Sequence, residues 1–166
     1  MRVFLDRFSK TSCIVLVGLV VFSLTLAATP GSGFLFNNRI FSTLVGDSIH
    51  QGAHWPGWNL QLELEGPTQI VQQDAALVPG GFSGWHSHPT PVIITVKSGT
   101  ATWYRADSPT CTPIIYPAGS AFIEPAGLVH FVANADSTNL ELLATYLIPN
   151  GMATRQEAQS PPQCPF

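Results

Sequence analysis

Short apolar segments separated by turn-forming residues constrain the fold of this chain more than any other feature of its sequence. Each segment is rich in β-branched or aromatic residues, and Gly, Pro, Asn, Asp or Ser residues bound it. The segments are Trp58–Glu65, Thr68–Val78, Val92–Lys97, Thr100–Arg105, Pro113–Tyr116, Ser120–Glu124, Val129–Asn134 and Asn139–Ile148. Because short strands at regular spacing without a long amphipathic helix are typical of antiparallel sheets, we predict an all-β sandwich or barrel.

The segments on either side of this series carry weaker patterns. Phe34–Val45 is apolar and is predicted to hold a first strand, whereas Ile49–Gly57 is predicted to be a loop. The clearest strand is Trp58–Glu65, because its leucines alternate strictly with polar residues, and we expect it to be half-buried. Met152–Gln159 has a weak helical pattern.

Length and charge exclude several classes of protein. The chain has 166 residues, a formal net charge of −3 and a charged fraction of 10%. Its length suits one domain with a single core, and a charged fraction far below the usual value of about 25% argues against a coiled coil or a disordered chain. Without residues 1–28, four basic and nine acidic residues give a net charge of −5. Because nucleic acids and anionic lipids attract basic surfaces, neither is expected as a partner.

The N-terminus has the pattern of a targeting segment. Met1–Lys10 is net positive, Thr11–Ala28 contains no charged residue, and Ala27 and Ala28 close the apolar run. This three-part pattern is typical of a secretory signal peptide, although an uncleaved membrane anchor has nearly the same length. Either alternative places the folded domain outside the cytoplasm, secreted or periplasmic, and an anchor would contact the membrane only through residues 11–28.

The chain divides into four predicted parts, and a disulfide bond is expected to join the last two. The parts are a signal peptide or membrane anchor (1–28), a linker and N-terminal strand region (29–54), a β-barrel (55–150) and a Pro-rich tail (151–166). Cys13 belongs to the apolar run, which leaves Cys111 and Cys164 for the exported part. Two cysteines in an oxidising compartment favour one disulfide, and a loop of about 50 residues closed in this way is worth about 4 kcal/mol in the chain-entropy model.

Three of the five histidines fall in two short Gly-containing segments. His86 and His88 end the segment GGFSGWHSH, and His130 follows the segment GSAFIEPAGLV. Because residues i and i+2 of a strand point to the same face, His86 and His88 direct two imidazoles at one point, and a partner strand can bring His130 there. Three neutral imidazoles on rigid strands suit Fe, Mn, Ni, Cu or Zn. The other two histidines, His50 and His54, lie in the predicted loop and are expected to be solvated.

These two segments resemble the two sequence motifs of the cupin superfamily. The first motif is Gly, five residues, His-x-His, three or four residues, Glu, six residues and Gly, and it is matched by Gly80, His86, His88 and Gly99. The second is Gly, five residues, Pro-x-Gly, two residues, His, three residues and Asn, and it is matched by Gly119, Pro125, Gly127, His130 and Asn134. The resemblance implies a double-stranded β-helix, a small jelly-roll barrel. It also implies that His86, His88 and His130 are the ligands of a divalent transition metal.

The first motif departs from the family pattern at one position. Val92 stands where the family has Glu, so the usual three-His-one-Glu site lacks its anionic ligand. The remaining set resembles the three-His sites of cysteine-dioxygenase-like cupins, and a divalent metal with only neutral ligands keeps its full charge. Glu124 is an alternative source of the carboxylate, but the Pro125–Gly127 turn between Glu124 and His130 argues against that role.

Function follows less directly than fold, because this fold supports many activities. The resemblance favours a metal-dependent, dioxygenase-like oxidoreductase that acts on a small molecule, with no catalytic residue assigned. The alternative is a non-catalytic cupin that binds or senses a small ligand. A cupin isomerase is disfavoured, because no His–carboxylate pair for acid–base catalysis is evident near the motifs. The sequence leaves open the identity of the metal and of the substrate, and whether the chain forms a homodimer.

Overall fold

The structure is a computed structural model that describes residues 28–164, so the predicted signal peptide or anchor lies outside the described residues except for Ala28. The described residues form β-strands and no helix, which confirms the all-β prediction. The strands are β1 (Ser32–Val45), β2 (Ile49–Trp55), β3 (Trp58–Leu64), β4 (Thr68–Phe82), β5 (His86–Ser87), β6 (Val92–Ser98), β7 (Thr100–Arg105), β8 (Ile114–Pro117), β9 (Ala121–Glu124), β10 (His130–Ala133), β11 (Leu140–Pro149) and β12 (Gln156–Glu157). Within residues 28–164, no helical segment capable of crossing a membrane is found.

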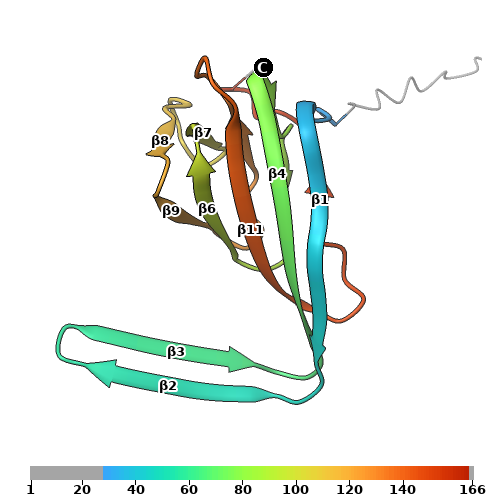
Figure 1. The fold of residues 1–166 in the computed structure, drawn as a ribbon, viewed down its shortest axis with the longest axis vertical. Coiled ribbons are helices and arrows are strands. Elements are labelled where there is room, and N and C mark those ends of the chain that lie inside the picture. The colour runs from blue at the N-terminus through green and yellow to red at the C-terminus, as the bar shows by residue number, and fades with distance from the viewer. Residues whose placement is uncertain (1–27, 165–166) are drawn as a thin grey trace, which may run out of the picture.

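Most of these strands form two layers of a nearly closed barrel (Figure 1). One layer has the order β9-β6-β11-β4-β1. The other has the order β12-β5-β10-β7-β8. Neighbouring strands pair antiparallel in both layers. β10 also pairs with β4 through Ala133 and Phe82, which joins the layers at one edge. This arrangement is the jelly-roll barrel that the sequence motifs implied.

Alternate side chains of the strands fill the space between the layers. On β11, the buried residues are Leu140, Leu142, Ala144, Tyr146 and Ile148, and the residues between them are more exposed. Because successive side chains of a strand point to opposite faces, this alternation places one face of β11 in the core. Full burial of one leucine or isoleucine stabilises the fold by about 2 kcal/mol. The same alternation directs Tyr146 into the barrel interior.

β2 and β3 form a separate hairpin that projects from the barrel (Figure 1). The predicted loop at Ile49–Gly57 is therefore wrong, because most of that segment is strand β2. Gly57 forms the turn with a φ of 78°, a conformation that favours glycine. Trp55 pairs with Trp58 beside this turn, and both side chains are exposed. Strand pairing forms this hairpin without a core to pack against, which is why Leu60 is exposed where the alternation predicted burial.

The segment after β11 lies along β5 in an extended conformation. The weak helix predicted at Met152–Gln159 is wrong, because β12 lies within it and pairs with β5. In this pairing Glu157 lies opposite His86. The Ala158 amide also donates a hydrogen bond to the carbonyl oxygen of Trp85 at 2.9 Å. The tail thus extends the layer that carries two of the three motif histidines.

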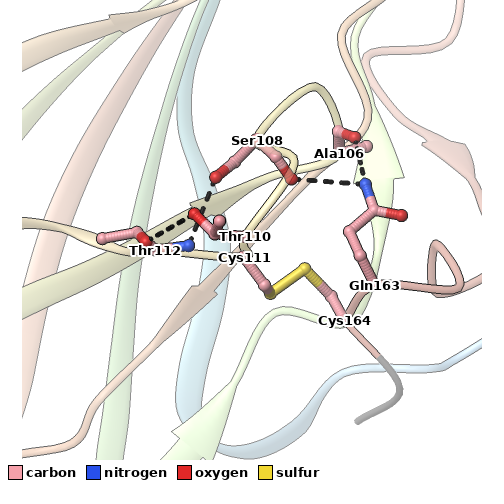
Figure 2. The surroundings of a disulfide bond; sticks show 7 residues. All are labelled: Ala106, Ser108, Thr110, Cys111, Thr112, Gln163 and Cys164. Atoms are coloured by element: carbon pink, nitrogen blue, oxygen red, sulfur yellow. Dashed lines mark hydrogen bonds between the residues drawn. A yellow bond between two sulfur atoms is a disulfide. The ribbon is translucent and has the colours of Figure 1, made fainter.

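A disulfide bond between Cys111 and Cys164 fixes the end of this tail to the loop between β7 and β8 (Figure 2). The sequence analysis expected the same pair. The two cysteines are 53 residues apart in the sequence. Gln163 adds a hydrogen bond from its Nε2 to the carbonyl oxygen of Ala106 at 2.7 Å. The tail is therefore held at two places, by strand pairing at β5 and by a covalent bond at its end.

Candidate metal centre

The three motif histidines meet inside the barrel. His86 begins β5, His88 follows its end, and His130 begins β10 directly opposite His86. The ring centroid of His86 lies 4.8 Å from that of His88 and 4.4 Å from that of His130. All three side chains are buried, and one ring nitrogen of each lies within 4.8 Å of the other two. The strand pairing of β5 with β10 thus produces the convergence that the sequence predicted.

The main chain fixes the orientation of all three imidazoles. The Nδ1 atom of His86 lies 2.9 Å from the carbonyl oxygen of Gly84, that of His88 lies 2.7 Å from Thr154 O, and that of His130 lies 2.8 Å from Leu128 O. A carbonyl oxygen only accepts hydrogen bonds, so each Nδ1 carries the hydrogen atom. In a neutral imidazole the Nε2 atom then has a free lone pair, which is the arrangement of a metal-binding histidine.

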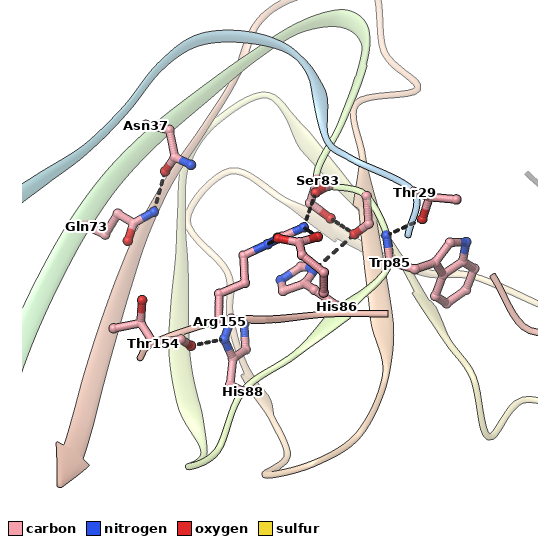
Figure 3. Close-up of polar contacts among 11 residues, drawn as sticks. Thr29, Asn37, Gln73, Ser83, Trp85, His86, His88, Thr154 and Arg155 are labelled. Carbon is pink, nitrogen blue, oxygen red and sulfur yellow. Dashed lines mark hydrogen bonds and ion pairs between the residues drawn. The ribbon is translucent and has the colours of Figure 1, made fainter. Parts of the chain in front are cut away.

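A glycine makes one of these contacts possible. Gly84 has a φ of 72°, and a Cβ atom there would lie 2.1 Å from the carbonyl oxygen of Thr29. The chain at Gly84 therefore needs both the left-handed conformation and the space that glycine provides. This turn places the Gly84 carbonyl against His86, and Thr29 accepts a hydrogen bond from the Trp85 amide at 3.0 Å (Figure 3).

Glu124 completes the buried cluster. Its Oε2 atom lies 3.1 Å from His88 Nε2, and its Oε1 atom lies 3.2 Å from His130 Nε2. The expectation that the Pro125–Gly127 turn keeps Glu124 away from the histidines is wrong. Glu124 ends β9, and its direction is set by the pairing of β9 with β6, in which it lies opposite Val92. The carboxylate missing from position 92 is therefore supplied from the neighbouring strand.

The electrostatics of the cluster favour a neutral imidazole at His86 and an ionised carboxylate at Glu124. Burial lowers the pKa of His86 to about 2, and the charges of His130 and Arg155 act in the same direction. Burial raises the pKa of Glu124, but its contacts with His130 and His88 outweigh burial and lower the pKa to about 2. Burial, followed by the charge of Glu124, raises the pKa of Tyr146 well above its usual value. Tyr146 therefore keeps its phenolic hydrogen at neutral pH.

The donor set of this cluster fits a divalent transition metal. With hydrogen on each Nδ1, the Nε2 lone pairs of His88 and His130 face the oxygens of Glu124. Among the residues that the structure describes, buried His130 Nε2 has no hydrogen-bond partner, although it lies 3.2 Å from Glu124. Unpaired buried polar atoms are costly, and a cation among these atoms removes the cost. Imidazole nitrogen and carboxylate oxygen are both ligands of such metals.

A cavity of about 130 Å³ adjoins the histidines. Strands β1, β4 and β11 and the C-terminal tail contribute to its wall, together with the site itself. The polar side chains among the lining residues outside the histidines are Asn37, Gln73, Ser83, Glu124, Tyr146, Thr154 and Arg155. Asn37 and Gln73 are hydrogen-bonded to each other, which ties β1 to β4 at the cavity.

Several of these cavity residues could not be identified from the sequence. Asn37 lies on β1, and Thr154 and Arg155 lie in the tail, all outside the two motifs. Their place beside the histidines follows from long-range strand pairing, which leaves no local sequence pattern. One signal was available, at Glu124. It is a charged residue on an otherwise apolar strand within the second motif, and the first motif lacks its Glu.

His50 and His54 lie apart from this centre, on the projecting hairpin (Figure 1). Both are exposed, as the sequence analysis expected. His50 lies 3.6 Å from an oxygen atom of Glu63 and 3.7 Å from one of Glu65. These contacts are solvent-exposed side-chain pairs on the hairpin and do not involve the barrel interior.

Comparison with known proteins identifies the same domain. The family model described as "Cupin domain" matches residues 73–146. The germin-like protein subfamily T member 3 of Arabidopsis thaliana is 28% identical over 76 residues, which cover 45% of this chain and 34% of that protein. The chain thus spans about a third of the curated relative that it matches.

Solved structures that resemble this chain share little sequence with it. A Klebsiella pneumoniae protein with a double-stranded beta-helix domain is 22% identical with a TM-score of 0.47, covering 69% of this chain and 87% of that one. The oxalate decarboxylase of Lactobacillus farciminis, in a formate complex, is 20% identical with a TM-score of 0.46, covering 53% and 26%. Similarity at this level carries no information on activity.

The family match and the motifs fall on the same part of the barrel. Residues 73–146 begin within β4, end within β11 and include the whole buried cluster of His86, His88, Glu124 and His130. Both motifs lie where the jelly roll brings β5 and β10 together, as the motif spacing implied. Residues 73–146 therefore match the cupin domain, and the barrel around them has the fold that the cupin motifs imply.

Proposed function

We propose that this cupin is a metal-dependent enzyme that acts on a small molecule. Its metal ligands would be the Nε2 atoms of His86, His88 and His130 and the carboxylate of Glu124. The observation that carries the proposal is the convergence of three imidazoles and one carboxylate in a buried cluster, with each Nδ1 held by a main-chain carbonyl oxygen. Imidazole and carboxylate are ligand types that Fe, Mn, Ni, Cu and Zn accept. The described residues contain a second group of potential ligands, His50, Glu63 and Glu65, but all three are exposed.

Glu124 changes the charge expected at the site. Three neutral histidines alone would leave a divalent ion with its full charge, whereas one carboxylate lowers the net charge of the centre to about +1. The site then resembles a three-His-one-carboxylate centre whose carboxylate comes from β9 instead of β6. An anionic ligand also strengthens retention of the metal when no substrate is bound.

The surroundings of the site support small-molecule chemistry. A redox-active ion held there would supply Lewis-acid and electron-transfer chemistry, and we favour an oxygen-using oxidoreductase as the reaction class. The cavity of about 130 Å³ limits the size of a ligand. Tyr146 lines the cavity and, because its pKa is raised, offers a hydrogen-bond donor to that ligand. Buried apolar residues such as Ile94 and Leu142 also line the cavity and limit its contact with water.

We further propose that the domain is located outside the cytoplasm, with residues 1–28 as signal peptide or anchor. The Cys111–Cys164 disulfide supports this location, because structural disulfides persist mainly in oxidising compartments. The tail that it holds supplies the Thr154 carbonyl to His88. An oxidising compartment would therefore favour the intact site.

The experiment that tests the function is elemental analysis of protein isolated from its native host, followed by oxygen-uptake assays with thiols, phenols and diketones. The expected result is about one transition-metal ion per chain and oxygen uptake with at least one substrate. Uptake should be lost when His130 is replaced by Ala. A protein that contains no metal but binds small ligands would support the non-catalytic alternative.

A further inference from the structure

We propose that Arg155 forms an anion-binding subsite beside the metal centre, so that the substrate of this protein carries a carboxylate or a similar anionic group. The inference rests on the proposed function, because it names the substrate class of the same site. Arg155 lies in the C-terminal tail, outside the residues that the cupin domain model matches. It is therefore a feature of this chain and not part of the motif signature.

The position of Arg155 places a cation in the wall of the cavity. Among the described residues that line the cavity, Arg155 is the one basic side chain and Glu124 the one acidic side chain. His86 and His88 line the same cavity, and Figure 3 shows Arg155 near both. Because Glu124 contacts His88 and His130, a ligand in the cavity has both Arg155 and residues of the metal centre in its wall.

The guanidinium group is held in place by its neighbours. Its Nε atom is hydrogen-bonded to Glu157, and its Nη2 atom donates to Glu157 Oε2 and to Ser83 O, both at 2.8 Å. These bonds leave the two N–H groups of Nη1 without a protein partner among residues 28–164. A fixed guanidinium with free donors binds a carboxylate with little loss of conformational entropy.

The charge balance of the site favours an anion over a neutral ligand. Glu157 neutralises much of the Arg155 charge, but a divalent ion with one carboxylate ligand remains net positive. An anion is therefore attracted to the cavity although the chain without residues 1–28 has nine acidic and four basic residues. A neutral ligand of the same shape gains neither the charge interaction nor a charge-assisted hydrogen bond from Nη1.

The alternative role of Arg155 is purely structural, as a clamp between the tail and Ser83. The chain offers a matched control for that role. Arg105 forms the same two-bond contact with the acidic residue two positions later, from Nε to Asp107 Oδ1 at 2.9 Å and from Nη2 to Asp107 Oδ2 at 2.6 Å. Arg105 does not line the cavity. Arg155→Gln and Arg105→Gln thus each remove a similar contact with an acidic residue. Only Arg155→Gln also removes a cation from the cavity wall.

The test compares acetate with acetamide, its neutral counterpart of similar shape. Full-length wild-type protein, Arg155→Gln, Arg155→Lys and Arg105→Gln are loaded with Co²⁺, and the dissociation constant of each probe is measured from the visible spectrum. Metal content and thermal midpoint are measured on every sample. We expect Arg155→Gln to raise the acetate Kd about tenfold or more while the acetamide Kd and the metal content stay the same. Arg155→Lys should give a smaller loss, and Arg105→Gln none.

An unchanged acetate Kd in Arg155→Gln, with metal retained, would overturn the inference. Equal weakening of acetate and acetamide would also overturn it, because that is the result of a structural clamp. If wild-type protein retains no Co²⁺, the proposed function fails, and acetate binding is then followed on metal-free protein through the ¹H–¹⁵N signal of the Arg155 side chain. A shift that saturates with acetate and not with acetamide would still support the subsite, and no shift would reject it.

Discussion

Val92 of β6 lies directly opposite Glu124 of β9, and both side chains are buried. Opposite residues of an antiparallel pair point to the same face of the sheet, with Cβ atoms about 5 Å apart. A carboxylate at either position therefore reaches the same part of the interior. Glu124, the residue before Pro125, can therefore take the place of the Glu that the first motif lacks at position 92.

The first prediction concerns Glu124 as a metal ligand. Glu124→Gln keeps the size and shape of the side chain but removes its charge and replaces one acceptor oxygen by a donor NH2 group. We expect the affinity for Mn²⁺ or Co²⁺ to fall at least about tenfold, because the anionic ligand is lost while the histidines remain. Competition with a chelator of known affinity measures the change. Unaltered metal affinity would show that Glu124 is not a ligand.

Exchange of the two positions provides the control for this prediction. Val92→Glu combined with Glu124→Val moves the carboxylate back to β6 and should restore most of the lost affinity. Val92→Glu alone places a second buried carboxylate opposite Glu124, so it should lower the thermal midpoint of the metal-free protein. If the double variant binds metal no better than Glu124→Gln, positions 92 and 124 do not serve the same site.

The second prediction separates the buried histidines from the exposed ones. His86→Ala, His88→Ala and His130→Ala each remove one of three imidazole ligands and should reduce metal occupancy sharply. His50→Ala and His54→Ala alter the projecting hairpin and should leave metal content unchanged. Elemental analysis of all five variants, purified in parallel, measures the effect. Equal metal content in both groups would contradict the assignment of the site.

Sequence and structure agree best where the determining pattern is local. The i, i+2 spacing of His86 and His88 and the motif around His130 predicted the cluster, because one strand pair brings these residues together. The expectation for Glu124 rested on the turn that separates it from His130 along the chain. The direction of its side chain is instead set by the pairing of β9 with β6. Arg155 carried no signal at all, because its place depends on how the tail pairs with β5.

The projecting hairpin is a second case in which the local sequence pattern did not predict the structure. Small and polar residues such as Gln51 and Gly52 hide the alternation of β2, so the segment resembled a loop. Its strand conformation comes from pairing with β3 along its whole length. Hydrophobic periodicity reports packing against a core, and it misses strands that pair without one.

The third prediction links the disulfide to stability and to the metal site. In the chain-entropy model, a cross-link between residues 53 apart stabilises the fold by about 4 kcal/mol. Cys111→Ser/Cys164→Ser should therefore lower the thermal midpoint. It should also weaken metal retention, because the freed tail holds the Thr154 carbonyl against His88 Nδ1 less firmly. Thermal denaturation and metal content measure the two effects.

A reducing agent supplies the control for the disulfide prediction. Reductant should shift the wild-type protein toward the behaviour of the double serine variant and should not affect that variant further. A wild-type protein whose midpoint and metal content are both insensitive to complete reduction would show that the bond contributes to neither property.

The fourth prediction concerns processing of the N-terminus. Cleavage after Ala28 would leave Thr29 as the first residue, and Thr29 Oγ1 accepts the hydrogen bond from the Trp85 amide. We expect mass spectrometry of protein from the native host to find an N-terminus at or near Thr29 in an extracytoplasmic fraction. Intact Met1 in a membrane fraction would identify an uncleaved anchor instead, and intact Met1 in the soluble cytosol would contradict export.

The fifth prediction assigns Asn134, the last residue of the second motif, a structural role. Its Nδ2 atom donates to Leu77 O at 2.9 Å and to Thr138 O at 2.8 Å, and its Oδ1 atom accepts from the Asp136 amide at 3.1 Å. The side chain is buried, so Asn134→Ala leaves polar main-chain atoms unpaired. We expect a loss of about 3 kcal/mol, or a fall in thermal midpoint of about 10 °C, measured by denaturation.

Two comparisons test whether this loss comes from the amide hydrogens of Asn134. Asn134→Asp has nearly the same shape but cannot donate to two carbonyl oxygens when ionised, so it should destabilise the protein as much as Asn134→Ala does. Asn59→Ala, at an exposed position of β3, should change the midpoint little. Below their midpoints all three variants should retain metal, because Asn134 holds the β4–β10 connection and touches no ligand. Loss of metal in a fully folded Asn134→Ala variant would instead place Asn134 in the functional site.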